Sequence, residues 1–489
     1  MIIIRNSKPL LVLGGLVSTA ALLIGLQQAQ AQAPQPGAPL SGAGSFPQSF
    51  IVPGTNTSLH VGGQIQMDLQ YNFDSFGTSS SVGAYDNLAA ASTELEGPGV
   101  VPGGPHTNSH VLRFTADNSK LFTETRTPSA YGEVKTYLEF DFQGGQAAFA
   151  GPNAAGSTTI KSNDDGIPRL RMAYGTLGPW LLGKAESNFV DLAALPDTLF
   201  GFGQAGAFDA VGTYRQTQIR YTWLLPDGIS AAGSIESAMS GGTFMVTPGV
   251  ANLNWNDFNA PGISQSVPAA TGTVRMDQPW GHAKLGLAVM QERFDSNGAA
   301  FAGLPGGTHF KRWGYQIQAS GHLNTFGKDQ AQWELGYGQG AAQYSGPLEL
   351  AQLGGNWEEG LVCGATVISA APKSFACSQP RVLGGYLGYT HFWNDQWRSG
   401  ITAGYDQESR PNGAGLFTSP AALGGVSTAN GNVNLAGLEH RHYSAGASLF
   451  WTPVAGVQFG SSFFWYRREV WSGARGTAER LMTQALFRF

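Results

Sequence analysis

Basic residues recur at alternating positions of several extended segments, and their chemistry is the binding of anions. Arg169 and Arg171, for example, lie on either side of Leu170. A two-residue interval places side chains on one face of a strand, and the planar guanidinium group of arginine binds two carboxylate oxygens at once. The candidate anion-binding residues are Arg126, Lys135, Arg169, Arg171, Lys184, Arg215 and Arg220.

Three other motifs have simpler explanations than chemistry. The string GFGQAG matches a dinucleotide fingerprint, but no strand and helix of a βαβ unit are predicted around it. Ser296 in DSNG has Phe294 where an adjacent histidine base would be needed, so we expect a turn. His440 and His442 would share a strand face, but no third ligand is evident nearby. We therefore predict no metal site, no cofactor and no enzymatic activity.

The two cysteines, Cys363 and Cys377, are expected to form a disulfide, because a single pair in an exported protein is usually bonded. They lie in a stretch that contains Gly and Pro and has no strand periodicity. The bond would therefore staple a loop.

The elements that position the basic residues are strands with one apolar and one polar face. In residues 59–73, LHVGGQIQMDLQYNF, every second residue is apolar or Gly. The body of the chain has no apolar stretch of about 18 residues, so helical membrane spans are not expected. Only 12% of residues are charged. This pattern favours an outer-membrane barrel, whose apolar face meets lipid and whose polar face lines water.

Sixteen such segments can be counted, an even number as bacterial barrels require. Tight turns and longer connections alternate strictly between them, which predicts short periplasmic turns and long extracellular loops. The predicted fold is all-β, a closed transmembrane antiparallel β-barrel of 16 strands around an aqueous channel. The expected strands are 57–73, 120–127, 132–143, 168–177, 180–188, 214–223, 229–236, 271–277, 281–291, 311–323, 329–338, 383–393, 397–407, 440–451, 457–471 and 478–489.

The two ends of the chain carry export and assembly signals. Residues 1–31 have a basic start, an apolar core and a small-residue cleavage pattern, which predict a signal peptide. Residues 32–54 are expected to be a short Pro/Gly-rich periplasmic segment, and residues 55–489 the barrel. The terminal Phe489 resembles the signal read by the barrel assembly machinery. The chain has a net charge of -5 and no polybasic tract, so nucleic acid is not an expected partner. Outer-membrane lipid and lipopolysaccharide are expected partners.

An unusually apolar connection, residues 189–213, is expected to fold into the barrel and narrow it. It carries Asp191, Asp197 and Asp209. Acid on this loop facing base on the wall would set a transverse field that orients dipolar solutes. In an alternative interpretation the arginines pair with the loop carboxylates and only hold the channel shape, because charges in a wet lumen are screened.

Four stretches together resemble the DcaP-like outer-membrane porins: PGTNTSLHVGG, FTETRTPSAYGEVKTYLEFDF, RLRMAYGTLGPWLLGKAESNFVDLAALPDTL and RQTQIRYTW. The resemblance implies a sixteen-stranded barrel, commonly a homotrimer, that passes small organic anions such as dicarboxylates. By this resemblance, the candidate pore residues are Arg126, Arg169, Arg171 and Arg220, and the candidate loop residues are Asp191 and Asp197. Family members can carry a coiled-coil-like segment ahead of the barrel, but residues 32–47 are too rich in Pro and Gly to form one here.

The expected function is therefore passive diffusion of small hydrophilic solutes, with a preference for organic anions. A weakly selective general or sugar porin is the alternative, since lumenal aromatic and Gln side chains could stack on and bind sugars. A barrel enzyme or adhesin is the third class, but no nucleophile–base pair is legible in the sequence.

Overall fold

The computed structural model describes most of the chain that follows the first 41 residues. The described residues are 42–73, 110–142, 168–199, 215–238, 243–247, 250–254, 267–295, 309–346, 361–368, 371–409, 439–471, 473 and 475–489. Within these ranges, no helix is both long and apolar enough to cross a membrane.

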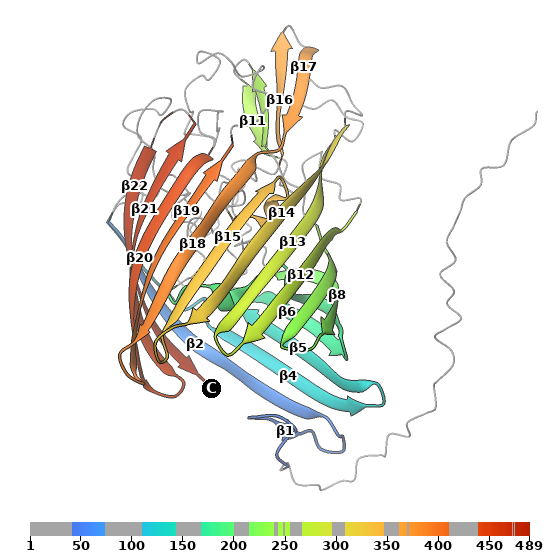
Figure 1. Cartoon of the computed structure of the whole chain (residues 1–489), viewed down its shortest axis with the longest axis vertical. Helices are drawn as coiled ribbons and strands as arrows, with labels where there is room; N and C mark the ends of the chain where they lie inside the picture. The colour runs from blue at the N-terminus through green and yellow to red at the C-terminus, as the bar shows by residue number, and fades with distance from the viewer. Residues whose placement is uncertain are drawn as a thin grey trace, which may run out of the picture.

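Sixteen antiparallel strands form a closed barrel, which confirms the predicted fold class (Figure 1). Every segment predicted from alternation coincides with a barrel strand, and the ends differ by at most four residues. The last strand pairs with the first, with Ile65 opposite Phe487. The barrel strands are β2 (Ser58–Asn72), β4 (Lys120–Ser129), β5 (Gly132–Asp141), β6 (Arg169–Leu177), β7 (Trp180–Glu186), β8 (Arg215–Leu224), β9 (Ile229–Glu236), β12 (Ala269–Gln278), β13 (Gly281–Asp295), β14 (His309–Asn324), β15 (Gln330–Gln339), β18 (Arg381–Phe392), β19 (Trp397–Glu408), β20 (Glu439–Val454), β21 (Val457–Val470) and β22 (Arg475–Arg488).

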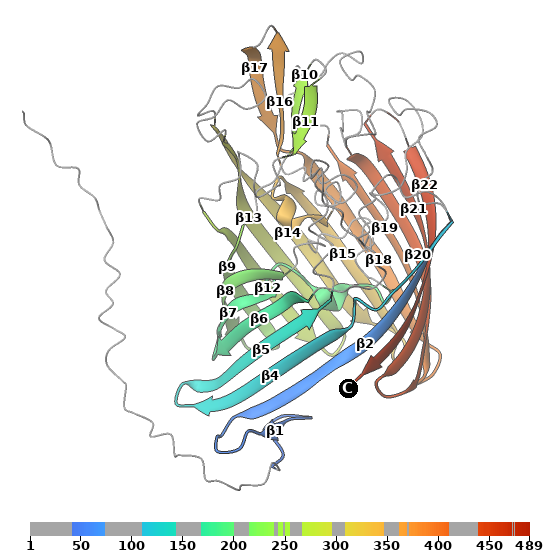
Figure 2. The same ribbon diagram turned by 180° about the vertical axis from the view of Figure 1, so that it is seen from behind.

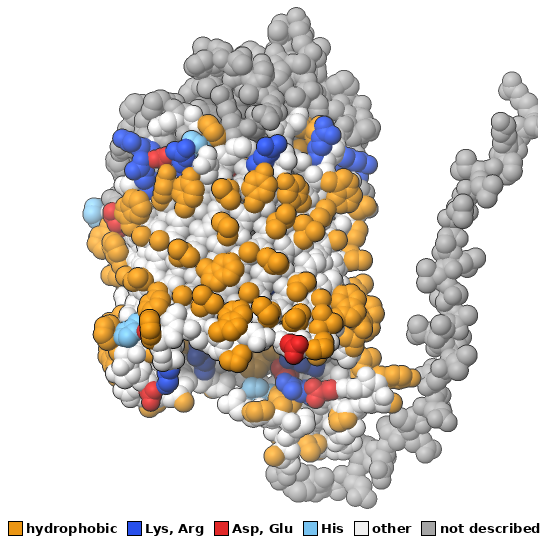
Figure 3. Space-filling model, viewed as in Figure 1, with side chains coloured by type: hydrophobic (Ala, Val, Ile, Leu, Met, Phe, Trp, Pro, Cys, Tyr) orange, Lys and Arg blue, Asp and Glu red, His pale blue; other side chains and the backbone are white. Residues whose placement is uncertain are grey.

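Alternation along each strand separates an apolar outside from a polar inside. On β13, Leu285 and Leu287 are 62% and 45% exposed, whereas His282 and Lys284 on the other face are buried. The outward apolar side chains form a band around the wall (Figure 3). In hydrocarbon every backbone N–H and C=O needs a partner, and only a closed ladder supplies it.

The two ends of the barrel differ. Tight connections such as residues 130–131 and 178–179 gather at the end where the chain terminates, and the strand ends that the longer connections join lie at the opposite end (Figure 1). The tight-turn end is periplasmic and the other is extracellular, following the rule for bacterial barrels.

Six short strands lie outside the sixteen. β1 (Phe50–Ile51) pairs with the start of β2, and β3 (Val111–Thr115) pairs with its other half. A separate sheet joins β10 (Thr243–Thr247), β11 (Val250–Asn254), β16 (Val362–Ile368) and β17 (Ala371–Ser378).

This small sheet corrects the expectation that the two cysteines staple an irregular loop. Cys363 on β16 lies opposite Cys377 on β17 in the register of an antiparallel pair. Cys377 is disulfide-bonded, and Cys363 is the only other cysteine in the sequence. Strand periodicity is weak there because both faces lie beyond the barrel, with no lipid on one side to enforce alternation.

The wall has an uneven height. β7 spans seven residues and β6 nine, whereas β14 spans sixteen. Figure 2 shows the short strands β4–β9 as the low side of the barrel.

Candidate pore constriction

The loop after β7 enters the barrel, as its apolar composition predicts. Phe189 is fully buried, and its ring lies 5.7 Å from that of Tyr344. Farther along, the Ala194 carbonyl accepts a hydrogen bond from the hydroxyl of Tyr386 on β18 at 3.2 Å. The Leu199 amide donates to Ser462 Oγ on β21 at 3.0 Å. Residues 187–199 therefore follow the inner wall from β7 round to β21.

Glu236 at the end of β9 anchors the start of this loop. Its carboxylate accepts hydrogen bonds from Ser187 Oγ at 2.7 Å and from the Asn188 amide at 2.9 Å. The Tyr344 hydroxyl donates to the same carboxylate at 3.1 Å. Burial is the main cause that raises the pKa of Tyr344, so this hydroxyl keeps its proton and remains a donor.

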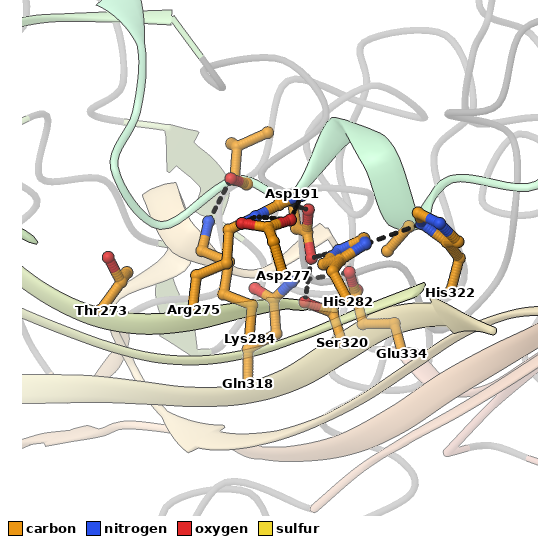
Figure 4. A network of polar contacts seen from close by, with 12 residues as sticks. Asp191, Thr273, Arg275, Asp277, His282, Lys284, Gln318, Ser320, His322 and Glu334 are labelled. Carbon is orange, nitrogen blue, oxygen red and sulfur yellow. Dashed lines mark hydrogen bonds and ion pairs between the residues drawn. The ribbon is translucent and has the colours of Figure 1, made fainter. Parts of the chain in front are cut away.

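Asp191 fastens the middle of the loop to the wall strands β12, β13 and β14. Its Oδ2 accepts hydrogen bonds from His282 Nε2 at 2.8 Å and from Ser320 Oγ at 2.7 Å, and Arg275 Nη1 lies 3.2 Å from Oδ1. Figure 4 shows these side chains reaching up from the strands toward the loop. Lys284 Nζ adds a hydrogen bond to the Phe189 carbonyl at 3.2 Å.

The surroundings of Asp191 stabilise its ionised form. Burial alone would raise its pKa, but the hydrogen bonds from His282 and Ser320 and the charge of Lys284 outweigh burial. Together they lower the pKa of Asp191 from 3.8 to about 2. The loop is therefore fixed by an ionised carboxylate that is 2% exposed.

Asp197 makes a second ionic anchor on β19. Arg398 Nε lies 2.5 Å from Asp197 Oδ2, and Arg398 also donates to Gln458 Oε1 at 3.0 Å. The same guanidinium group lies 4.3 Å from the ring centre of Phe450. The third acidic loop residue of the prediction, Asp209, lies outside the described residues.

The wall partners of the loop were not predicted. The basic residues predicted from the sequence lie between 126 and 220, whereas Arg275, His282, Lys284 and Arg398 lie on β12, β13 and β19. Their only signal was their alternation, since His282 and Lys284 are two residues apart within an expected strand. Which of them meets the loop depends on long-range register, which spacing does not reveal.

Arg169 and Arg171 pair with carboxylates of the neighbouring strand β5. Arg171 lies 2.7 Å from both Glu139 Oε1 and Asp141 Oδ2, and Arg169 Nη2 lies 2.5 Å from Asp141 Oδ2. The Arg169 side chain keeps 37% of its surface exposed, against 11% for Arg171. The expected opposition of loop acid and β6 base is thus corrected, because Asp191 and Asp197 meet bases of other strands.

A second basic layer lies closer to the periplasmic turns. Arg126 and Lys135 both pair with Glu124, at 2.7 and 3.1 Å. The Arg126 side chain is 33% exposed and its guanidinium group lies 4.4 Å from the ring centre of Phe46. These two residues and Arg169 are thus brought to one side of the barrel.

The remaining basic candidates have different surroundings. Lys184 Nζ donates to the Leu170 carbonyl on β6 at 2.9 Å, so this group braces two strands. Arg215 lies opposite Glu186 in the β7–β8 register. Arg220 lies opposite Leu181 in the same register and donates to the Glu186 carbonyl at 3.5 Å.

His442 has carboxylates beside it that were not predicted from the sequence. Its Nδ1 lies 2.8 Å from Asp406 Oδ1, and Glu408 completes a buried group whose ligand atoms lie within 4.8 Å of one another. Asp406 and Glu408 are at the end of β19 and His442 at the start of β20, so strand pairing joins residues more than thirty apart in sequence.

Comparisons with known proteins agree with this architecture. A family model described as a porin subfamily matches residues 44–481. The outer membrane channel DcaP of Acinetobacter baumannii superposes with a TM-score of 0.59 at 18% identity, over 88% of this chain and 97% of that one. The anion-selective porin from Comamonas acidovorans gives 0.45 at 10% identity, over 88% and 100%. No curated protein sequence matches the chain.

Proposed function

Because the chain belongs to the porin subfamily and is a DcaP-like porin of the bacterial outer membrane, we propose that it is a passive diffusion channel that prefers small organic anions such as dicarboxylates. The observation that carries the proposal is the basic side of the lumen, where Arg126 and Arg169 remain about one-third exposed. Their guanidinium groups can bind carboxylate oxygens in pairs.

The charge balance of the low side of the wall supports an anion preference. Strands β4–β9 contain eight Lys and Arg residues and six Asp and Glu residues, a difference of +2. The loop carboxylates Asp191 and Asp197 do not cancel this excess, because bases of β12, β13 and β19 pair with them. A low-dielectric wall strengthens such an excess inside a narrow channel.

Reversal potentials in a salt gradient test the preference. We expect the wild-type channel to pass anions better than cations, and Arg126→Gln with Arg169→Gln to move the permeability ratio toward one. Lys328→Gln is the control, because this lysine lies in a periplasmic turn with 67% of its side chain exposed. Equal permeability in the wild type, or no change in the double variant, would refute the anion preference.

A sugar channel is the second candidate, and an aromatic row on the inner wall favours it. Phe122, Tyr137 and Tyr174 stack across β4, β5 and β6 at ring-centre distances of 5.6 and 5.5 Å. Liposome swelling with matched acids and sugars separates the candidates. Faster swelling with dicarboxylates supports the first, and faster swelling with neutral sugars supports the second.

We also propose that the low side of the barrel is where copies of the chain meet in a homotrimer. The seven residues of β7, at about 3.3 Å each and a tilt of roughly 40°, rise only about 18 Å, less than an apolar band of about 25 Å. The outer face there is also less apolar. Thr125 and Thr136 hydrogen-bond to each other on this face at 2.6 Å, and Gly175 lies opposite Thr136 on the next strand.

Native mass spectrometry in mild detergent tests this face. We expect a trimer for the wild type and a monomer for Gly175→Trp, because a bulky ring would separate close-packed walls. Ala403→Trp, on the outward face of β19 across the barrel, is expected to leave the trimer intact. Loss of the trimer in Ala403→Trp but not in Gly175→Trp would show that the copies do not meet at the low side of the barrel.

A further inference from the structure

The extracellular rim carries basic residues that no part of the channel function uses. Arg441 on β20 and Arg475 on β22 both lie opposite Glu469 of β21 in the strand register, and Arg467 lies two residues before Glu469 on the same strand. We name these three arginines the rim cluster. Glu469 pairs with Arg467 and lies 3.9 Å from Arg441, so one carboxylate serves two guanidinium groups.

The rim cluster faces outward, away from the lumen. On β20 the alternation that exposes Leu449 on the outer wall places Arg441 on the same face. On β21 Phe463 and Arg467 share the outer face in the same way, whereas Tyr466, next to Arg467, is on the inner face and only 2% exposed. The cluster therefore meets whatever surrounds the barrel at its extracellular end.

An aromatic collar adjoins the rim cluster. The ring of Tyr443 lies 5.1 Å from that of Tyr405 and 5.8 Å from the Arg467 guanidinium carbon. Aromatic residues of this kind mark the boundary between hydrocarbon and head groups. The arginines thus lie at head-group height, directly above the apolar band.

The same arrangement recurs around the wall. Arg293 and Lys311 are cross-strand partners on β13 and β14, and Arg381 begins β18. In Figure 3 the Lys and Arg side chains follow the upper margin of the apolar band, with few acidic side chains among them.

Three arginines around one carboxylate leave the rim cluster with a net positive charge. A net positive group that is continuous with an apolar surface is complementary to an amphiphile whose head carries several negative charges. Arginine favours phosphate in particular, because two N–H groups reach two phosphate oxygens.

We propose that the rim cluster is a binding site for the phosphate groups of lipopolysaccharide in the outer leaflet. The acyl chains lie against the apolar band below the cluster, and the phosphorylated sugars meet Arg441, Arg467 and Arg475. This placement rests on the outer-membrane location of the channel but not on its solute preference. Lipopolysaccharide would then seal the extracellular margin of the wall.

Binding of diphosphorylated lipid A to the full-length purified protein in neutral detergent tests the site. At about 1 kcal/mol for each basic residue near an anionic surface, Arg467→Gln with Arg475→Gln is expected to weaken binding about thirtyfold. The matched control is Lys328→Gln with Arg488→Gln, which removes two charges at the periplasmic end. Dephosphorylated lipid A is expected to bind the wild type as weakly as the diphosphorylated form binds the rim variant.

Three outcomes would overturn the proposal: a rim variant within twofold of the wild type, an equal loss in the periplasmic control, or equal binding of dephosphorylated lipid A. Conductance in phosphatidylcholine bilayers is measured in parallel and is expected to match the wild type in both variants, which shows that the barrels are folded. A wild-type protein that binds lipid A but passes no ions would refute the channel function and leave the lipid site standing.

Discussion

Asp191 is the residue on which the position of the constriction depends most. Asp191→Asn removes the charge that meets Arg275 and weakens the hydrogen bond from His282. Removing one partner of a buried ion pair typically costs about 3–5 kcal/mol, so we expect the loop to detach for a measurable fraction of the time. Hydrogen exchange in residues 189–195 would then accelerate, and single-channel current would become noisier.

The control for this prediction is Asp395→Asn. Asp395 also pairs with a lysine, Lys328, but its side chain is 88% exposed in a periplasmic turn, where an ion pair contributes little. Unchanged loop exchange in Asp191→Asn would show that the apolar contacts alone hold the loop.

Acidification gives a second test of the same residue. A carboxylate whose pKa falls from 3.8 to about 2 on folding stabilises the folded state above pH 3.8 and loses that contribution as the pH falls through 2. Asp191 is therefore expected to stay ionised, and the loop to stay docked, between pH 7 and pH 4. Hydrogen exchange corrected for its intrinsic pH dependence checks this. Release of the loop near pH 5 would mean that another group controls it.

At the scale of single residues, the sequence predicted the basic side of the lumen better than the partners of the loop. Arg126 and Arg169 follow from alternation alone, because a two-residue period states which face a side chain occupies. The pairing of Asp191 with His282 follows from the path of a loop across the barrel. No periodicity encodes that path.

At the scale of elements, the loop is held by packing as well as by charge. Phe189 is fully buried, and a Cβ added to Gly286 would lie only 3.2 Å from its ring. Phe189→Ala is expected to cost about 3–5 kcal/mol and to widen the channel, with a larger single-channel conductance. Phe326→Ala, in a turn where the ring is 81% exposed, is the control and is expected to leave conductance unchanged.

The barrel strands were predictable because lipid and water impose the same two-residue period on all of them. β3 and the sheet of β10, β11, β16 and β17 were not predicted, and the reason is physical. The sheet lies beyond the band where one face must be apolar, so its residues carry no strict alternation, whereas β3 pairs with the wall strand β2 but spans only five residues. The predicted disulfide loop became a hairpin for that reason.

At the scale of the whole molecule, the final residue extends the pairing that closes the barrel. The backbone of Phe489 hydrogen-bonds with Gly63 in both directions, at 3.0 and 3.1 Å, and the Phe489 side chain is 61% exposed. We propose that this ring is read by the barrel assembly machinery. Phe489→Ala is then expected to lower the amount of assembled barrel several-fold in the outer membrane, as measured by heat-modifiable migration in gels.

Refolding in detergent provides the control for this prediction. The backbone pairing does not need the aromatic ring, so purified Phe489→Ala is expected to refold to a channel of wild-type conductance. A variant that fails to refold would assign the ring to the stability of the barrel instead of to recognition during assembly.

The pairing of β22 with β2 joins the last strand of the barrel to the first. Until both strands are in place, the two margins of the sheet lack partners and can recruit any other extended chain. A chain cut short before residue 475 would therefore keep two unpaired margins, and we expect it to aggregate.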